Sequence, residues 1–140
     1  MSHHVHKIAA FSLPLEDRVG ALLKVARDLN SHGVDLKDIS GWVEDEGQAR
    51  VVFIPTEPAL VAGCGCETCC AAQPVTLLWV EMEDRPGIIA EYLGKLAEAG
   101  INIKSVHATA WGGKGVAVYH FADVATLDAA AQALGECCTK

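Results

Sequence analysis

The stretch Glu16-Asp17-Arg18-Val19-Gly20 recurs later in the chain as Glu83-Asp84-Arg85-Pro86-Gly87, a shift of 67 positions. The same shift, with no gap, pairs Leu29 with Leu96, Gly33 with Gly100, Lys37 with Lys104 and Val51 with Val118. A register that holds over this length indicates an internal repeat. The sequence therefore predicts two copies of one module of about 65 residues.

The second copy indicates which elements each module contains. Residues 75–82 are β-branched and apolar, which is typical of a strand. A helix is then expected with Asp84 at its N-cap, Pro86 in its first turn and Gly100 at its end. The remaining elements follow in order: strands over residues 101–111 and 116–121 with a turn at 112–115 between them, a second helix over 124–134, and a short final strand over 136–139.

The predicted order β-α-β-β-α-β is the split βαβ, or ferredoxin-like, arrangement. It is an α+β fold in which two helices cover one face of an antiparallel sheet. We expect two tandem modules, at residues 5–63 and 75–140, separated by a cysteine-rich linker at 64–74. Such small modules bury little surface and leave free sheet edges, so we also expect a homodimer.

Composition and charge exclude several classes of protein. Of the 140 residues, 51% are apolar and 21% are charged, which excludes an intrinsically disordered chain. The net charge of −7, with no basic cluster, argues against a nucleic-acid partner. No apolar run is long enough to span a membrane, and no secretory signal is visible, so a cytoplasmic protein is expected. Motifs of the common enzyme classes are missing, which predicts a protein that is not an enzyme.

The repeated loop also carries a family resemblance. Asp84-Arg85-Pro86-Gly87, the helix after it, and then Ala99-Gly100-Ile101-Asn102-Ile103 resemble an ACT domain. The resemblance covers residues 75–134 well and residues 6–55 more loosely, and the pair resembles the stand-alone tandem ACT proteins of bacteria. It implies a non-catalytic regulatory protein that binds a small effector, usually an amino acid, at the interface between ACT modules. It also implies that any regulated enzyme is a separate chain.

The resemblance further implies which residues hold the effector. The ligand is expected against the loop after a module's first strand and the start of its first helix, and the second strand of the neighbouring module completes the site. Carried over by position, the residues of the second copy are Asp84, Arg85, Pro86, Gly87 and Ile88, with Asn102. Those of the first copy are Asp17, Arg18, Val19, Gly20 and Ala21, with Asp35.

Physical chemistry supports a ligand at this loop independently of the resemblance. A helix N-terminus offers free N–H groups and a partial positive charge, which suit a carboxylate. Gly87 permits close approach to the backbone, and Asp84 can accept a hydrogen bond from an ammonium group. The alternative is that the loop serves only as a helix cap and turn. Because Asp35 would repel an anionic ligand, the second copy is favoured as the intact site.

The cysteines suggest a second function. The cysteines form two groups: Cys64, Cys66, Cys69 and Cys70, and then Cys137 and Cys138. The shift that relates the two copies aligns Cys69-Cys70 with Cys137-Cys138. Without an export signal these thiols should be reduced, which favours a metal or a redox role. Thiolates suit Zn²⁺, Cu(I) or an iron–sulfur cluster, and a zinc ion at the cysteine cluster is the cofactor expected. The alternative function is therefore a thiol-based metal-binding or redox-sensing protein. The competing interpretation is that the cysteines serve only as small apolar side chains in the core. His32, His107 and His120 are expected to be ordinary polar residues.

Overall fold

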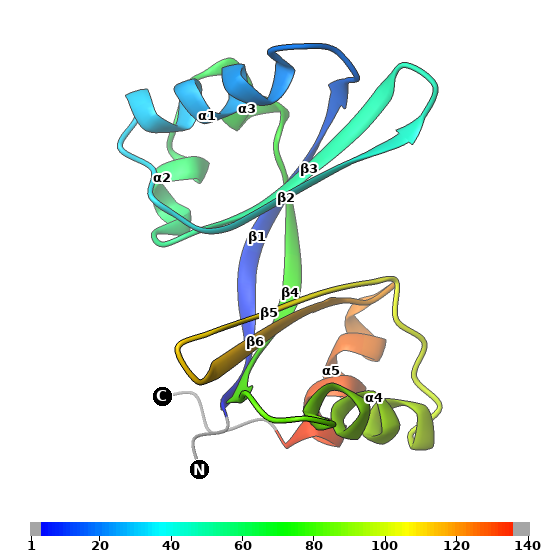
Figure 1. The fold of residues 1–140 in the computed structure, drawn as a ribbon. Coiled ribbons are helices and arrows are strands. Elements are labelled where there is room, and N and C mark those ends of the chain that lie inside the picture. Colours follow the sequence, from blue (N-terminus) through cyan, green and yellow to red (C-terminus); the bar gives the residue numbers. More distant parts are fainter. Residues whose placement is uncertain (1–3, 136–140) are drawn as a thin grey trace. The chain divides into compact units, whose positions relative to one another are not determined.

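A computed structural model of the chain describes residues 4–135, which form two compact units (Figure 1). The N-terminal unit is Ala9–Val75, and the C-terminal unit combines Met1–Ile8 with Thr76–Lys140, of which residues 4–8 and 76–135 are described. The secondary structure is mixed α+β with antiparallel strand pairs, as predicted. No helix in the described range is long and apolar enough to cross a membrane.

The N-terminal unit contains three antiparallel strands and three helices. Its elements are β1 (His4–Glu16), α1 (Ala21–Ser31), β2 (Leu36–Asp45), β3 (Gln48–Pro55), α2 (Pro58–Ala62) and α3 (Glu67–Ala71). Strand β3 pairs with both β1 and β2, with Phe53 opposite Phe11 and Ile39. Helix α1 buries Ala21, Val25 and Leu29, whose spacing of four residues places them on one face. That face completes a core with Phe11 and Phe53.

In the C-terminal unit both helices have 11 residues, whereas in the N-terminal unit α1 has 11 residues and α2 and α3 have 5 residues each. Its elements are β4 (Gln73–Glu83), α4 (Ile88–Glu98), β5 (Ser105–Trp111), β6 (Lys114–His120) and α5 (Val124–Leu134). Strand β6 pairs antiparallel with β4 and with β5, and glycines at the β5–β6 turn adopt positive φ. Helix α5 begins at Asp123, whose carboxylate accepts a hydrogen bond from the Thr126 N–H at 2.8 Å. The observed α5 coincides with the predicted helix.

Strand β1 contributes to both units. Hydrogen-bonded strand neighbours follow the order β2-β3-β1-β4-β6-β5, so β1 is beside β4. The first residues of β1 belong to the C-terminal unit, where Val5 is fully buried in one cluster with Leu78 and Tyr119. The final strand predicted at 136–139, together with Cys137 and Cys138, lies outside the described residues.

The segment expected to be a linker, residues 64–74, is part of the N-terminal unit. It forms α3 and the start of β4. Cys69 is only 7% exposed and packs in the same core as Val25, while Cys64 and Cys66 pack against that core from its edge. The segment has this place because its cysteines, together with Ala72, supply small apolar surface that the unit's core can bury.

Candidate functional site

The loop between β4 and α4 holds Gly87 at the N-cap of the helix, in the left-handed region with φ 86°. No side chain caps this helix, so the predicted N-cap role of Asp84 is wrong. The reason is that the helix begins only at Ile88, after the left-handed turn at Gly87, which leaves Asp84 too far back in the sequence. The N–H of Ile88 donates to the Arg85 carbonyl at 3.2 Å, and the rest of the first turn has no side-chain acceptor.

A pocket of about 180 Å³ lies beside this helix start, within the C-terminal unit. Asp84 and Ile88, both predicted site residues, line it. Its other walls come from the end of β4, the start of α4 and strands β5 and β6, and they include Met82, Glu83, Ile89, Thr109 and Val116. The pocket therefore combines a mainly apolar wall with two carboxylates and the N-terminal end of a helix.

Two further residues of the predicted site point elsewhere. Arg85 forms an ion pair with Glu91 and donates a hydrogen bond to the Glu91 carboxylate. This hydrogen bond lowers the pKa of the Glu91 carboxyl and raises the pKa of Arg85. Asn102 is not on β5 as predicted, because that strand begins at Ser105. It lines a separate hollow with Lys104 and Thr126, at the other end of α4. Within the C-terminal unit the structure brings Asp84 and Ile88 together and leaves Asn102 apart.

The first copy has the same backbone turn but different surroundings. Gly20 is the N-cap of α1 with φ 89°, and no side chain caps that helix either. Arg18 forms an ion pair with Glu16 at 2.9 Å and lines a pocket of about 220 Å³ together with Ala21. The charged residues Lys24 and Glu67 also line this pocket. It is therefore more polar than its counterpart in the C-terminal unit.

Asp35 of the first copy is engaged in local structure. Its carbonyl accepts hydrogen bonds from the Thr56 backbone N–H and hydroxyl, each at 2.9 Å. The same hydroxyl lies 3.1 Å from the Asp35 carboxylate. Asp17 likewise donates its backbone N–H to the Gly47 carbonyl at 3.0 Å. These contacts hold the ends of the β2–β3 hairpin.

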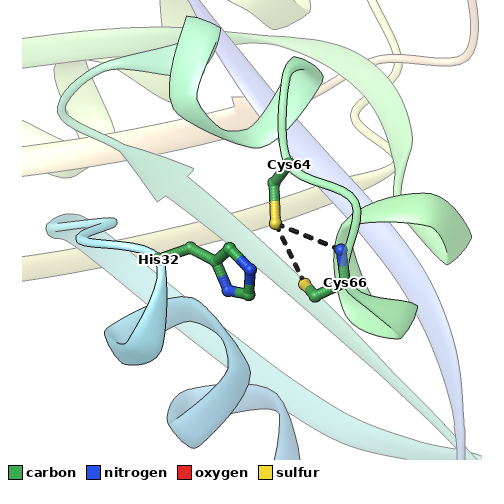
Figure 2. Close-up of side chains that lie close together, drawn as sticks. All are labelled: His32, Cys64 and Cys66. Atoms are coloured by element: carbon green, nitrogen blue, oxygen red, sulfur yellow. Dashed lines mark hydrogen bonds between the residues drawn. The ribbon is translucent and has the colours of Figure 1, made fainter.

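The cysteine group has a histidine neighbour that the sequence did not indicate. One ligand atom from each of His32, Cys64 and Cys66 lies within 4.8 Å of the other two, and Figure 2 shows the imidazole pointing toward the sulfurs. The Cys64 and Cys66 sulfurs are 3.1 Å apart. His32 was expected to be an ordinary helix-end residue. It lies beside the cysteines because α1 packs against α3, and the spacing of these residues in the sequence does not predict that packing.

The cysteines differ in their protonation chemistry. Burial raises the pKa of the Cys69 thiol, and its hydrogen bonds to Cys64 and Cys66 raise it further. Burial also opposes ionisation of Cys64, but hydrogen bonds from the Cys69 thiol and from the Cys66 backbone and thiol outweigh it and lower the pKa of Cys64. Cys64 is thus the thiol that ionises more readily, stabilised by its neighbours. Cys70 is exposed.

Comparison with known proteins identifies part of the chain. The model of the ACT domain matches residues 75–139, so the chain contains one ACT domain there. A protein of Bacteroides thetaiotaomicron has a similar structure, with a TM-score of 0.78, 18% identity and coverage of 93% of this chain and 88% of that one. No curated protein matches the chain.

Regulatory subunits of aspartate kinase have similar structures as well. The subunit from Thermus thermophilus matches with a TM-score of 0.63 and 17% identity, and it covers 95% of this chain and 97% of that one. The subunit from Thermus flavus matches with a TM-score of 0.57, 20% identity and the same coverage. At these identities the likeness shows a shared fold.

Proposed function

We propose that the chain is a non-catalytic regulatory protein of two ACT modules that binds an amino acid and thereby controls a separate enzyme. The supporting observation is the pocket beside Gly87, where an uncapped helix start, two carboxylates and an apolar wall lie together. The helix N-terminus suits the ligand's carboxylate, and Asp84 or Glu83 suits its ammonium group. Met82, Ile89 and Val116 offer an apolar surface for its side chain.

The absence of a side-chain cap favours this proposal over a purely structural loop. A loop that existed to cap α4 would place a side-chain oxygen on its first N–H groups, as Asp123 does for α5. At α4 and at α1 a left-handed glycine occupies that position instead. The first N–H of each helix, at Ile88 and at Ala21, donates to the carbonyl of Arg85 or Arg18, and the next N–H groups of both first turns remain available to an anionic group.

The second module is favoured as the effector site. Its pocket is the more apolar of the two, whereas the corresponding loop of the first module faces Lys24 and Glu67. Arg85 is held by Glu91 and does not line the pocket, so the carboxylate would be bound mainly by backbone N–H groups. The likeness to regulatory subunits of aspartate kinase supports a partner enzyme carried on another chain. A homodimer remains part of this proposal.

A thermal-shift screen of the reduced full-length chain against the common amino acids tests the proposal. A ligand present at about one hundred times its dissociation constant stabilises the folded protein by about 2.7 kcal/mol, which raises Tm by several degrees. We expect a rise with one chemical group of amino acids, followed by a saturable titration in calorimetry. No rise with any amino acid would contradict the proposal.

A further inference from the structure

The cysteine and histidine group of the N-terminal unit serves no purpose in effector binding. We propose that His32, Cys64 and Cys66 bind one zinc ion, with Cys69 as its fourth ligand. The ligands come from three places in the unit: the C-terminal end of α1, the turn after α2, and the start of α3. A nitrogen and three sulfurs form one of the common ligand sets of closed, tetrahedral zinc sites.

The first argument is the spacing of the ligand atoms. In a tetrahedral zinc site with Zn–S bonds of about 2.3 Å, neighbouring sulfurs lie about 3.8 Å apart. The Cys64 and Cys66 sulfurs are 3.1 Å apart, and each lies within 4.8 Å of a His32 ring nitrogen. An outward movement of well under 1 Å at the two sulfurs therefore makes room for the ion. Such a movement is within the reach of side-chain rotation.

The second argument is the hydrogen bonding of the sulfurs. The Cys66 N–H points to the Cys64 sulfur at 3.4 Å, and the Cys69 N–H points to the Cys66 sulfur at 3.3 Å. The second of these bonds also caps α3, since Cys66 is its N-cap residue. Backbone N–H groups directed at sulfur stabilise the thiolate form, which is the form that binds a metal. The turn therefore holds two sulfurs ready for ionisation.

The third argument is the orientation of His32. Its Nδ1 lies 3.0 Å from the Asp28 carbonyl oxygen, which can only accept a hydrogen bond. The Ser31 hydroxyl, which donates to the same carbonyl, lies 3.1 Å from Nδ1. Both oxygens can accept from a protonated Nδ1, and in that tautomer Nε2 keeps its lone pair for a metal. Figure 2 shows the ring directed at the cysteine sulfurs. Histidines that bind metals are commonly oriented in this way, by a carbonyl or carboxylate on the other ring nitrogen.

Cys69 completes the ligand set. It is nearly buried, it follows Cys66 by three residues in the same segment, and its backbone N–H points to the Cys66 sulfur, although it is not within the 4.8 Å group that includes His32. Cys70, its neighbour, is exposed and takes no part in the group. When zinc binds, the three thiols lose their protons to solvent and each sulfur forms a bond to the ion. His32 binds as the neutral ring and releases no proton.

The chemistry of the group favours zinc over other metals. Calcium and magnesium require oxygen ligands, and none of the four ligand atoms is an oxygen. An iron–sulfur cluster normally uses four cysteines, whereas only three are brought together here. Zinc accepts mixed nitrogen and sulfur ligands without a strong geometric demand. Its binding would join α1 to the segment that contains α2 and α3.

Metal titration of the reduced, metal-free full chain tests this proposal. Zinc is titrated in competition with a chromogenic chelator, and cobalt is used as a spectroscopic substitute. We expect one zinc per chain and a cobalt spectrum that shows thiolate charge transfer with tetrahedral coordination. The variants Cys66→Ser, Cys69→Ser and His32→Ala should each weaken zinc affinity at least tenfold. Zinc should also raise Tm of the wild-type chain.

Two controls make the result specific. Cys70→Ser removes an exposed thiol next to a proposed ligand and should leave zinc affinity unchanged. A His3→Ala/His4→Ala variant excludes binding by the N-terminal histidines. If Cys66→Ser fails to fold, His32→Ala decides, because His32 is exposed at a helix end. No bound zinc, selective binding of Cu(I), or equal losses in Cys66→Ser and Cys70→Ser would each overturn the proposal.

Discussion

The Thr68 hydroxyl donates a 2.6 Å hydrogen bond to the carboxylate of Asp28, which joins α3 to α1 across forty residues of sequence. Thr68 is the one buried polar residue among residues 4–135, at 4% exposure. This bond lowers the pKa of the Asp28 carboxyl, and a second hydrogen bond from Lys24 adds to the effect. The contact positions the helix that carries Cys66 and Cys69 on the helix that ends at His32.

We therefore expect Thr68→Val to lower the Tm of the chain, because it removes the hydroxyl and keeps the side-chain volume. The Asp28 carboxylate would lose its shortest hydrogen bond. Thr76→Val, at an exposed strand position, is the matched control and should change Tm little. Chemical denaturation followed by circular dichroism measures both. Equal effects of the two substitutions would show that the Thr68–Asp28 bond contributes nothing measurable.

Replacement of Gly87 by leucine should abolish effector binding and leave the chain folded. A side chain at this position has open space around it, but the left-handed backbone adds a strain of about 1–2 kcal/mol and the side chain lies where the ligand approaches. Gly20→Leu is a matched control, since Gly20 has the same conformation at the start of α1. Calorimetry with the effector should detect binding to Gly20→Leu only. The reverse pattern would place the site in the first module.

Replacement of Tyr119 by phenylalanine should stabilise the chain. The Tyr119 ring is fully buried and stacks on Phe121, but its hydroxyl has no hydrogen-bond partner among residues 4–135. Removal of an unsatisfied buried hydroxyl should raise the free energy of unfolding by about 1 kcal/mol or more. Phe121→Tyr, which adds a hydroxyl to a buried ring, should have the opposite effect. A lower stability of Tyr119→Phe in urea unfolding would show that the hydroxyl does find a partner.

Protonation of His120 should destabilise the C-terminal unit in mildly acidic solution. Burial lowers the pKa of His120 below its usual value of 6.5, and the charge of Lys104 lowers it further. The fold therefore favours the neutral ring, and this contribution is present above pH 6.5 and is lost as the pH falls through the lowered pKa. His120→Gln should flatten the decline in stability between pH 8 and about pH 5. Parallel pH profiles for the wild type and the variant would contradict this.

Truncation of Val5 to alanine should destabilise the unit that contains the ACT domain. Val5 is fully buried in a cluster with Leu78 and Tyr119, so the loss of two carbon atoms should cost about 1.6 kcal/mol before any cavity effect. The control is Val124→Ala, at a position that is 69% exposed. Hydrogen exchange of amides in β6 reports on the unit concerned. Unchanged protection of the β6 amides in Val5→Ala would show that Val5 does not stabilise this core.

Periodic and local features of the structure were predictable from the sequence. The helix at Val124–Leu134 and the glycine turn between β5 and β6 follow from side-chain periodicity and turn residues, and both were predicted. The sequence predicted Asp84 as the N-cap of α4, whereas the N-cap is Gly87 in the left-handed conformation. The segment Asp84-Arg85-Pro86-Gly87 fits either position, so the sequence pattern alone does not distinguish them. Asp84 and Ile88, both expected at the ligand site, line the same pocket, and their closeness in sequence accounts for this.

The features that depend on tertiary packing were not predictable in this way. His32 meets Cys64 and Cys66 only because α1 packs beside the segment of α2 and α3, and no spacing rule connects residues so far apart. Residues 64–74 were expected to be a linker because four cysteines with two glycines suggest a metal loop or a spacer. In the structure this segment belongs to the N-terminal unit, and Cys69 is buried in the core cluster of that unit.

The position of Val5 also orders events during translation. Val5 leaves the ribosome well before Leu78 and Tyr119, its neighbours in the core, are added. The start of β1 must therefore wait without its final contacts while the whole N-terminal unit is synthesised. The C-terminal unit consequently depends on residues that are made before the N-terminal unit. A fusion partner placed directly before Val5 would accordingly test the folding of the C-terminal unit.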